Sequence, residues 1–426
     1  MSLNTTPSSE RIHIGFFGRT NAGKSSLMNT VTGQQISLVS EIKGTTTDPV
    51  RKTMELLPLG PIVFIDTPGL DDHTGLGELR ETRTREILNQ IHIAVIVVDI
   101  TEGMTEVENR LQQQLTQAQI PYLIVYNKKD LLEINQDFDK KNPVRLEETK
   151  QENSDSINTE NGKIDVVYVS AVTGENIHLL KEKIAAIKVK DEEKKIVADL
   201  LEEGDHVVLV IPIDKAAPKG RLILPQQQTI RDILDAGCTL SVCQVENVKA
   251  TLELLQKPPK LVITDSQVFS KVKELVPENI MLTSFSILFA RYKGNLESTV
   301  KGAFQIEGLK AGDKILISEG CTHHRQCGDI GTEKLPKWIL KYTEKKLVFE
   351  FTSGEEFPTN LEEYNLIIHC GACMLNEKQM QGRILSAKEQ KIPMTNYGIV
   401  IAYLNGILQR SIEPFGILKN RGKRTF

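Results

Sequence analysis

The chain has 426 residues and a formal net charge of −4, and 40% of its residues are hydrophobic while 25% are charged. At roughly 100–200 residues per domain, this length predicts two to four domains, and the composition excludes a mainly disordered chain. The apolar runs fall far short of the roughly 18–20 residues of a membrane span, and the opening MSLNTTPSSE lacks the pattern of a signal peptide. We therefore expect a cytoplasmic protein without membrane contact. Its slightly acidic balance argues against general nucleic-acid binding.

A phosphate-binding loop follows the first apolar run. Residues 11–17 are typical of a buried strand, and they lead into Gly18-Arg-Thr-Asn-Ala-Gly-Lys-Ser25, a full G-x-x-x-x-G-K-[ST] match that opens a helix. In this context backbone N–H groups wrap the phosphates, Lys24 neutralises their charge and Ser25 ligates Mg²⁺. The expected nucleotide-binding residues of the loop are Gly18, Asn21, Ala22, Gly23, Lys24, Ser25 and Ser26.

Two further motifs have the residues needed to recognise a base. An apolar strand leads into Asn127-Lys-Lys-Asp130, and a carboxylate at position 130 can accept protons from guanine N1 and N2, which adenine does not offer. Another apolar strand leads into Ser170-Ala171, whose backbone would contact the guanine O6. The expected base-binding residues are Asn127, Lys128, Asp130, Ser170 and Ala171.

The fourth motif, Asp66-Thr-Pro-Gly69, also ends an apolar strand. Asp66 would reach Mg²⁺ through water, and the Gly69 N–H would meet the γ-phosphate. In this order the four motifs resemble the guanine-nucleotide motifs of the translation-factor-related GTPases. The resemblance implies that the nucleotide is GTP and that the first domain is a P-loop GTPase.

The switch region resembles that of the Era/TrmE-like subgroup. Gly44-Thr-Thr-Thr-Asp48 is similar to its switch I motif, which implies that Thr46 closes over Mg²⁺. Asn21 resembles the asparagine that holds K⁺ in that subgroup; the alternative is a turn residue that tolerates an unusual φ. Leu70 stands where Ras-like proteins carry a water-orienting glutamine. The resemblance thus implies slow, potassium-stimulated hydrolysis, with Lys24, Asn21 and Thr46 as catalytic residues.

The patterns along the chain predict an α/β protein of three domains. The GTPase domain, with a mostly parallel sheet, is expected over residues 9–188, and its polar stretch 133–165 is predicted to be a solvated loop and helix. Strands alternating with helices over 189–279 predict a small α/β domain without visible chemistry, for which dimerisation is the default role. Its two cysteines, Cys238 and Cys243, are expected in the core.

The third domain, residues 280–426, carries a dense group of cysteines and histidines. They fall after two apolar runs, 315–318 and 366–368, which could bring both groups to adjacent strand ends. Four thiolates, from the two cysteine pairs, suit either an Fe–S cluster or tetrahedral zinc. The residues concerned are Cys321, His323, His324, Cys327 and Asp329, followed by His369, Cys370 and Cys373.

The pattern C-x-H…H-C-x-x-C, with the GTPase motifs before it, resembles the HydF family of [FeFe]-hydrogenase maturation GTPases. Residues 284–294 and 329–331 also look like family segments. The resemblance implies a homodimeric scaffold and carrier with a C-terminal cluster-binding domain. It would receive a di-iron precursor made with two radical-SAM maturases and deliver it to the apo-hydrogenase. The implied ligands of a [4Fe–4S] cluster are Cys321, Cys370 and Cys373.

The fourth cluster ligand stays open at this point. His323 and His369 are candidates, as are Asp329 and Cys327, and Cys327 is absent from the family pattern. The alternative interpretation of the whole chain is an Era/TrmE-like GTPase that acts on RNA or ribosomes and carries a structural zinc site. Only the basic tail 419–424 favours it.

Overall fold

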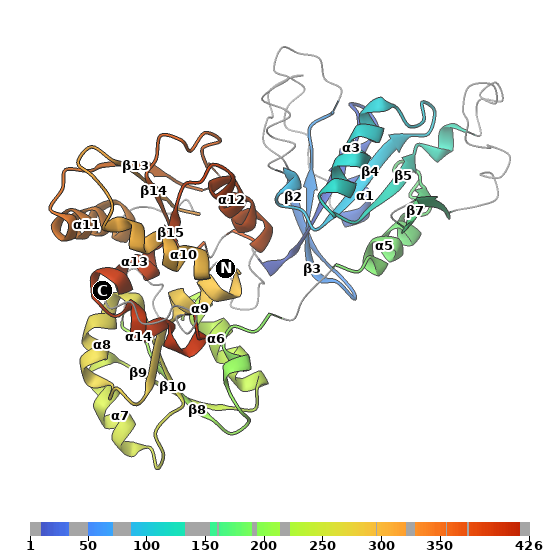
Figure 1. Cartoon of the computed structure of the whole chain (residues 1–426). Coiled ribbons are helices and arrows are strands. Elements are labelled where there is room, and N and C mark those ends of the chain that lie inside the picture. Colours follow the sequence, from blue (N-terminus) through green and yellow to red (C-terminus); the bar gives the residue numbers. More distant parts are fainter. Residues whose placement is uncertain are drawn as a thin grey trace. The chain divides into compact units, whose positions relative to one another are not determined.

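The computed structural model divides into two compact units, Met1–Lys190 and Asp191–Phe426 (Figure 1). The structure describes residues 10–33, 50–70, 87–132, 154–159, 162–189, 194–213, 222–294, 296–320, 329–354, 356–372 and 375–417. No helix in these ranges is both long and apolar enough to cross a membrane.

The first unit is built on a seven-stranded sheet with the strand order β2-β3-β1-β4-β5-β7-β6. It is parallel except at its two edges, where β2 and β6 run antiparallel to β3 and β7. Every residue of β4 is buried, as expected for a central parallel strand covered on both faces. The strands are β1 (Ile12–Phe17), β2 (Arg51–Leu56), β3 (Gly60–Asp66), β4 (Ile93–Asp99), β5 (Tyr122–Asn127), β6 (Ser154–Thr159) and β7 (Gly162–Tyr168).

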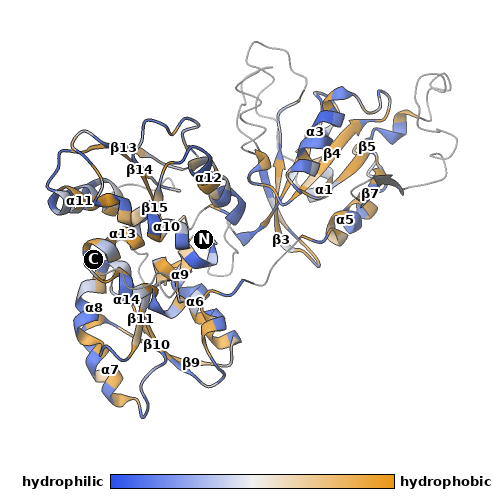
Figure 2. Ribbon diagram, viewed as in Figure 1, coloured by the Kyte–Doolittle hydropathy of each residue, from blue (hydrophilic) through white to orange (hydrophobic). Residues whose placement is uncertain are grey.

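Helices cover both faces of this sheet. Helices α1 (Lys24–Thr32) and α5 (Ile177–Ala186) pack on one face, and α3 (Glu106–Gln117) packs on the other. Figure 2 shows the central strands as predominantly hydrophobic and the outer surfaces of the helices as mixed. The predicted α/β domain with a mostly parallel sheet is therefore confirmed.

One expectation for this unit is wrong. The polar stretch 133–165 was predicted to be loop and helix, but 154–159 form strand β6, which pairs with β7. An edge strand pairs with only one neighbour, so it tolerates a mostly polar sequence such as Ser-Asp-Ser-Ile-Asn-Thr, which by itself argues against a strand. Residues 133–153 lie outside the described part of the chain.

The second unit contains two parallel four-stranded sheets, with the orders β11-β10-β8-β9 and β13-β12-β14-β15. The strands are β8 (His206–Val210), β9 (Thr239–Cys243), β10 (Leu261–Thr264), β11 (Met281–Ser284), β12 (Lys314–Ser318), β13 (Val348–Thr352), β14 (Leu366–His369) and β15 (Met394–Asn396). The helices are α6 (Leu224–Asp235), α7 (Val248–Leu254), α8 (Phe269–Leu275), α9 (Phe285–Tyr292), α10 (Leu296–Ala303), α11 (Leu335–Thr343), α12 (Glu377–Glu389), α13 (Tyr397–Leu404) and α14 (Leu408–Ile412).

The two sheets are not separated at the expected boundary between residues 279 and 280. Strand β11 lies beyond that boundary, yet it pairs with β10 in the first of the two sheets. Helix α14 also packs on this sheet, where the Thr283 hydroxyl of β11 donates to the Ser411 carbonyl at 2.9 Å. Apolar residues of α13 and α14 share a core with β8 and β10. Both expected domains therefore form one compact unit.

The prediction that the two cysteines of the middle region lie in the core is confirmed for Cys238, whereas Cys243 is only partly buried. Cys238 is buried, and its thiol donates to the Glu202 carbonyl at 3.1 Å. Cys243 packs at the margin of the core, where burial raises the pKa of its thiol.

Candidate functional site

The phosphate-binding loop lies between β1 and α1. Lys24 is buried, and its Nζ donates to the carbonyls of Gly18 at 3.0 Å and Arg19 at 2.8 Å. Its charge is thus held inside the loop, where the motif places phosphate oxygens. Gly23 has φ +87°, and a Cβ there would lie 2.3 Å from Asn127 Nδ2, so both backbone conformation and space require glycine.

A divalent-cation site is suggested by Ser25 and Asp66. The Ser25 hydroxyl donates to Asp66 Oδ2 across 41 residues of sequence. The other oxygen, Asp66 Oδ1, is buried without a hydrogen-bond partner. Burial raises the pKa of this carboxyl, against the opposing effects of Ser25, Lys24 and Lys52. A buried carboxylate oxygen beside a serine hydroxyl fits Mg²⁺, a cation that prefers oxygen ligands.

The segment after β3 runs beside the phosphate-binding loop. Leu70 N–H donates to the Gly18 carbonyl at 3.2 Å. A Cβ on Gly69 would lie 2.2 Å from the Thr20 hydroxyl, so only glycine allows this approach. Thr46, the expected switch residue, lies outside the described residues.

The expected base-recognition residues meet at the ends of β5 and β7. Asp130 Oδ1 accepts a hydrogen bond from the Ser170 hydroxyl at 2.6 Å, and Ser170 is fully buried. Lys128 has φ +67° and forms an ion pair of 2.5 Å with Asp99 at the end of β4. The sequence analysis did not single out Asp99 as a partner of the base-recognition motif. The available signal was an acidic residue directly after the apolar run 93–98.

Asn127 connects three loops. Its Nδ2 donates to the Ala22 carbonyl and its Oδ1 accepts from the Ala171 N–H, both at 3.0 Å. The Ala171 N–H, expected at the guanine O6, is therefore engaged with Asn127 in this structure. A backbone contact from Ala171 to the base stays a prediction.

Two loop residues complete the nucleotide site. Asn21 is exposed with φ +65°, a conformation that asparagine tolerates; its role toward K⁺ stays a prediction. Arg19, which the sequence did not single out, pairs with Glu102 and with Glu108 Oε1 at 3.3 Å. Glu108 is buried in the N-terminal capping box of α3, so this contact ties the loop to that helix.

Two candidate metal ligands that the structure describes, His369 and Cys370, lie at the carboxyl end of β14, beside that of β12. These strands are parallel neighbours, and Ser318 pairs with His369, as the two apolar runs suggested. Cys370 Sγ accepts backbone N–H bonds from Gly320 at 3.0 Å and from Ala372 at 3.3 Å. Such N–H contacts stabilise a thiolate, which is the form that binds metal.

The described part of this site holds only some of the predicted ligands. Residues 321–328 and 373–374 lie outside it, and with them Cys321, His323, His324, Cys327 and Cys373. Among the described residues, no three histidine, cysteine or acidic side chains form a metal-binding group.

His369 is fully buried and both of its ring nitrogens are engaged. Nε2 lies 2.8 Å from Arg383 Nη1, and Nδ1 lies 2.9 Å from the Cys370 carbonyl. Because an arginine only donates, Nε2 accepts and Nδ1 carries the proton. This arrangement disfavours His369 as the fourth cluster ligand, because neither nitrogen has a lone pair directed at a metal.

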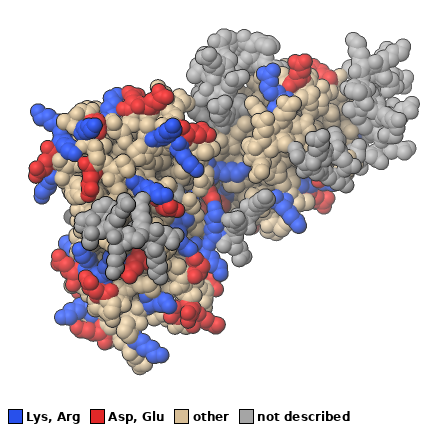
Figure 3. All heavy atoms as spheres, in the orientation of Figure 1, with Lys and Arg blue, Asp and Glu red and all other residues tan. Residues whose placement is uncertain are grey.

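Tyr397 lies near Cys370 and near two acidic residues, Glu319 and Asp329. Tyr397 OH donates to buried Glu319 at 3.3 Å, and burial, with the charges of Glu319, Cys370 and Asp329, raises the pKa of the tyrosine. Asp329 accepts from Thr332 N–H at 2.8 Å and from its hydroxyl at 2.9 Å. The face shown in Figure 3 carries acidic and basic side chains mixed together over the described residues.

Comparison with known proteins agrees with the geometry of the first unit. Residues 13–128 match the model of the 50S ribosome-binding GTPase family. GTPase Der from Campylobacter jejuni is 36% identical over 180 residues, covering 41% of this chain and 36% of that protein. The tRNA modification GTPase MnmE from Nitrosomonas europaea is 34% identical over 173 residues, covering 40% and 34%. The chain thus spans about a third of the length of these curated relatives.

Among solved structures, Aquifex aeolicus Era bound to GDP·AlF4⁻ is 20% identical, with a TM-score of 0.32, and covers 55% of this chain and 92% of that one. The fold, the loop geometry and the family match define the first unit as a P-loop GTPase domain.

The second unit identifies the family. Residues 196–294 match the hydrogen maturase F dimerization domain, and residues 297–414 match the hydrogen maturase F tetramerization domain. These two matches together cover half of the chain and lie directly after the GTPase domain. The chain belongs to the hydrogen maturase F (HydF) family, and it carries domains of the kind that form oligomers.

Proposed function

We propose that this protein is a cytoplasmic, GTP-hydrolysing scaffold for assembly of the [FeFe]-hydrogenase active site. It holds a [4Fe–4S] cluster on Cys321, Cys370 and Cys373, receives a di-iron precursor as cargo from radical-SAM maturases, and delivers it to the apo-hydrogenase. The observation that supports this most is Cys370, whose sulfur receives two backbone N–H bonds where β12 and β14 end side by side. Family membership supports the cargo and the partners.

The cluster-binding residues fit this role by their chemistry. Small residues beside Cys370, namely Gly320, Gly371 and Ala372, let backbone N–H groups approach the sulfur, which suits Fe–S ligation. A bound cluster would supply an iron to which a second iron unit can attach. Three thiolates leave that iron with a weaker fourth ligand, for which His323 and Asp329 remain candidates. Cys327 in the fourth position would instead close the site with a fourth thiolate.

In the GTPase domain, residues 9–188, we propose that Ser25, Asp66 and Thr46 hold Mg²⁺, and that Lys24 binds the β- and γ-phosphates. Asn21 binds K⁺ beside the phosphates. The two ions offset the negative charge that develops during phosphoryl transfer. Asp130 recognises guanine, and Ser170 keeps its carboxylate oriented. Leu70 cannot orient water, so hydrolysis is slow.

We propose a homodimer for the solution state, formed through the second unit, whose expected domains were 189–279 and 280–426. The dimerization and tetramerization family models support self-association there.

Iron and acid-labile sulfide analysis of anaerobically purified protein tests the proposal. We expect about four of each per chain, as in a [4Fe–4S] cluster, and slow GTPase activity in the same sample. Stoichiometric zinc without sulfide would overturn the scaffold function. It would favour an Era/TrmE-like GTPase that acts on RNA or ribosomes and carries a structural zinc site.

A further inference from the structure

The short turn after β14 that contains Cys370 is held by a lysine from another part of the chain. Lys293 directly follows α9, and its Nζ donates to the carbonyls of Gly371 at 3.3 Å and of Ala372. These carbonyls belong to the two residues between the cysteines of the C-x-x-C motif. We propose that Lys293 is a positioning residue for the cluster: it fixes this turn and places a positive charge beside the sulfur ligands. The inference rests on the proposed iron–sulfur site.

One peptide group links the lysine to the sulfur. The Gly371 carbonyl that accepts from Lys293 and the Ala372 N–H that donates to Cys370 Sγ at 3.3 Å are the two ends of the same peptide unit. An ammonium group on the oxygen polarises this unit and strengthens the N–H bond to the sulfur, because hydrogen bonds in a chain reinforce one another. Lys293 therefore acts on Cys370 through the peptide group.

The turn needs such support because its backbone is not relaxed. Ala372 has φ +52°, a left-handed conformation in which the Cβ of an alanine is strained against the backbone. Ala372 is also buried, at 2% exposure, so neighbouring contacts must hold it in place. Both carbonyls bound by Lys293 flank this strained residue, and their contacts with the ammonium offset part of the strain.

Lys293 is itself connected to the helix that follows the turn. Gln381 of α12 donates its Nε2 hydrogen to the Lys293 carbonyl at 2.5 Å. The end of α9, the cysteine turn and α12 are thus joined through one residue. Across the turn, Arg383 of α12 binds His369 Nε2, Ser318 Oγ at 3.3 Å and the Gly354 carbonyl at 2.9 Å, and so supports the end of β14.

A cation at this place has an electrostatic consequence. A cluster with three thiolates is anionic, and reduction adds a further negative charge. A positive charge on the cysteine turn favours the more negative state of a cluster bound there, so it raises the reduction potential. A purely structural contact would not have this effect, which separates the two roles experimentally.

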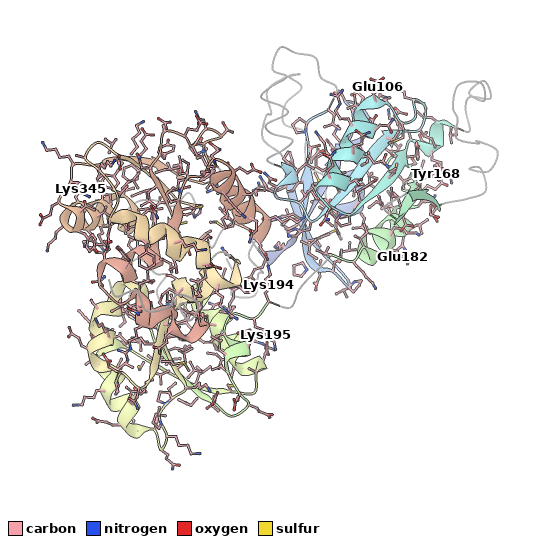
Figure 4. All side chains as sticks on the ribbon, in the orientation of Figure 1. Glu106, Tyr168, Glu182, Lys194, Lys195 and Lys345 are labelled. Carbon is pink, nitrogen blue, oxygen red and sulfur yellow. The ribbon has the colours of Figure 1, made fainter. Side chains whose placement is uncertain are left out.

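The chain offers a matched control in Lys345, which follows α11 and is labelled in Figure 4. Its Nζ also donates to two backbone carbonyls, those of Glu307 at 3.3 Å and of Leu309. Glu307 and Leu309 precede β12 and Lys345 precedes β13, whereas the cysteine turn follows β14. Because the three strands are parallel, the control contact lies at their amino-terminal ends, whereas the cysteine turn lies at their carboxyl ends.

The experiment compares the full-length parent with Lys293→Met, Lys293→Gln, Lys293→Arg and Lys345→Met after anaerobic reconstitution with iron and sulfide. Iron per chain, the rate of iron loss to a chelator and the potential from an EPR-monitored redox titration are measured. For Lys293→Met we expect several-fold faster iron loss and a lower potential. Lys293→Arg, which keeps charge and donors, should restore both, and Lys345→Met should match the parent.

Lys293→Gln is included because Lys293→Met removes both the charge and the hydrogen-bond donors and could prevent folding. Glutamine keeps a donor for one carbonyl but has no charge, so the potential should fall while the fold is kept. A parental potential and a parental rate of iron loss in Lys293→Gln would overturn the role of Lys293. A parent chain that takes up no iron would instead overturn the proposed iron–sulfur site, which is a different result.

Discussion

The amide of Asn127 donates to the carbonyl of Ala22 at 3.0 Å, although 105 residues separate them in the sequence. One residue of the base-recognition motif thus supports the phosphate-binding loop. Because Asn127 is 2% exposed, removing its side chain leaves the Ala22 carbonyl and the Ala171 N–H buried without this partner.

We therefore expect Asn127→Ala to lower the free energy of unfolding of the GTPase domain by about 1–3 kcal/mol. The variant should also weaken binding of GTP and GDP alike, since both nucleotides use the same loop. Denaturant unfolding and nucleotide titration check this. Asn109→Ala, at an exposed position of α3, is the control and should leave both quantities unchanged. Parental stability in Asn127→Ala would show that the two contacts contribute nothing.

Asp130→Asn should change the nucleotide preference from GTP to XTP. The carboxylate accepts protons from guanine N1 and N2, whereas xanthine carries an oxygen at position 2 that an amide can donate to. The amide oxygen can still accept from Ser170, so the local structure is kept. We expect roughly 10–100-fold weaker GTP binding, the equivalent of one or two hydrogen bonds to a charged group. If the variant binds GTP as tightly as the parent, Asp130 is not the residue that recognises the base.

Potassium should accelerate GTP hydrolysis relative to sodium, and Asn21 should be responsible. Because Asn21 has φ +65°, glycine is the suitable replacement: it removes the side chain without backbone strain. We expect Asn21→Gly to hydrolyse GTP at the same slow rate in both salts, as measured by phosphate release. Lys24→Ala, which removes the charge inside the loop, should abolish nucleotide binding. Equal rates for the parent in the two salts would remove the potassium assignment and leave GTP hydrolysis itself intact.

Cys321→Ser, Cys370→Ser and Cys373→Ser should each lose most of the cluster, whereas Cys327→Ser should keep it. Serine is nearly isosteric with cysteine but is a harder ligand that holds iron less well. Anaerobic reconstitution followed by iron counting and EPR of the reduced samples makes the comparison. Loss of iron in all four variants would indicate a closed four-thiolate centre. That result would contradict an open site to which a second iron unit attaches.

The stability of the GTPase domain should depend on pH through His13. Burial lowers the pKa of His13 to about 4, and the charge of Arg51 acts in the same direction. As the pH falls, His13 therefore takes up a proton near pH 6.5 in the unfolded state but only near pH 4 in the folded state. Above pH 6.5 His13 does not lower the free energy of unfolding. Between pH 6.5 and pH 4 it lowers this free energy increasingly as the pH falls, by about 2 kcal/mol at pH 5.

His13→Phe isolates this contribution. A phenyl ring can keep the stacking that His13 makes with His92, whose ring centroid lies 5.7 Å away, but it does not titrate. Unfolding free energies of parent and variant are compared at pH 7 and pH 5. The parent should lose about 2 kcal/mol more than the variant over this interval. Equal losses would mean that His13 has an ordinary pKa in the folded protein.

The GTPase domain and the positions of its nucleotide motifs after the strands could be predicted from local sequence patterns. Each nucleotide motif directly follows a strand, and a parallel sheet brings the carboxyl ends of its strands to one edge, so local patterns are enough to place them. The same reasoning correctly made β12 and β14 neighbours, and it assigned Cys238 to the core. The family resemblance rests on spacing that is also visible without a structure.

The contacts between distant segments could not be predicted in this way. Nothing near Asn127 in the sequence points to Ala22, and nothing near Lys293 points to the turn at Gly371. The polar strand β6 forms because a sheet edge tolerates polar residues, and β11 joins β10 across the expected domain boundary. His369 was a candidate ligand by sequence, but Arg383 of α12 donates a hydrogen bond to its Nε2, the nitrogen that could have bound a metal. Such outcomes depend on which side chains folding brings together, because hydrogen bonds and burial act over a few ångströms of space, whatever the separation in the sequence.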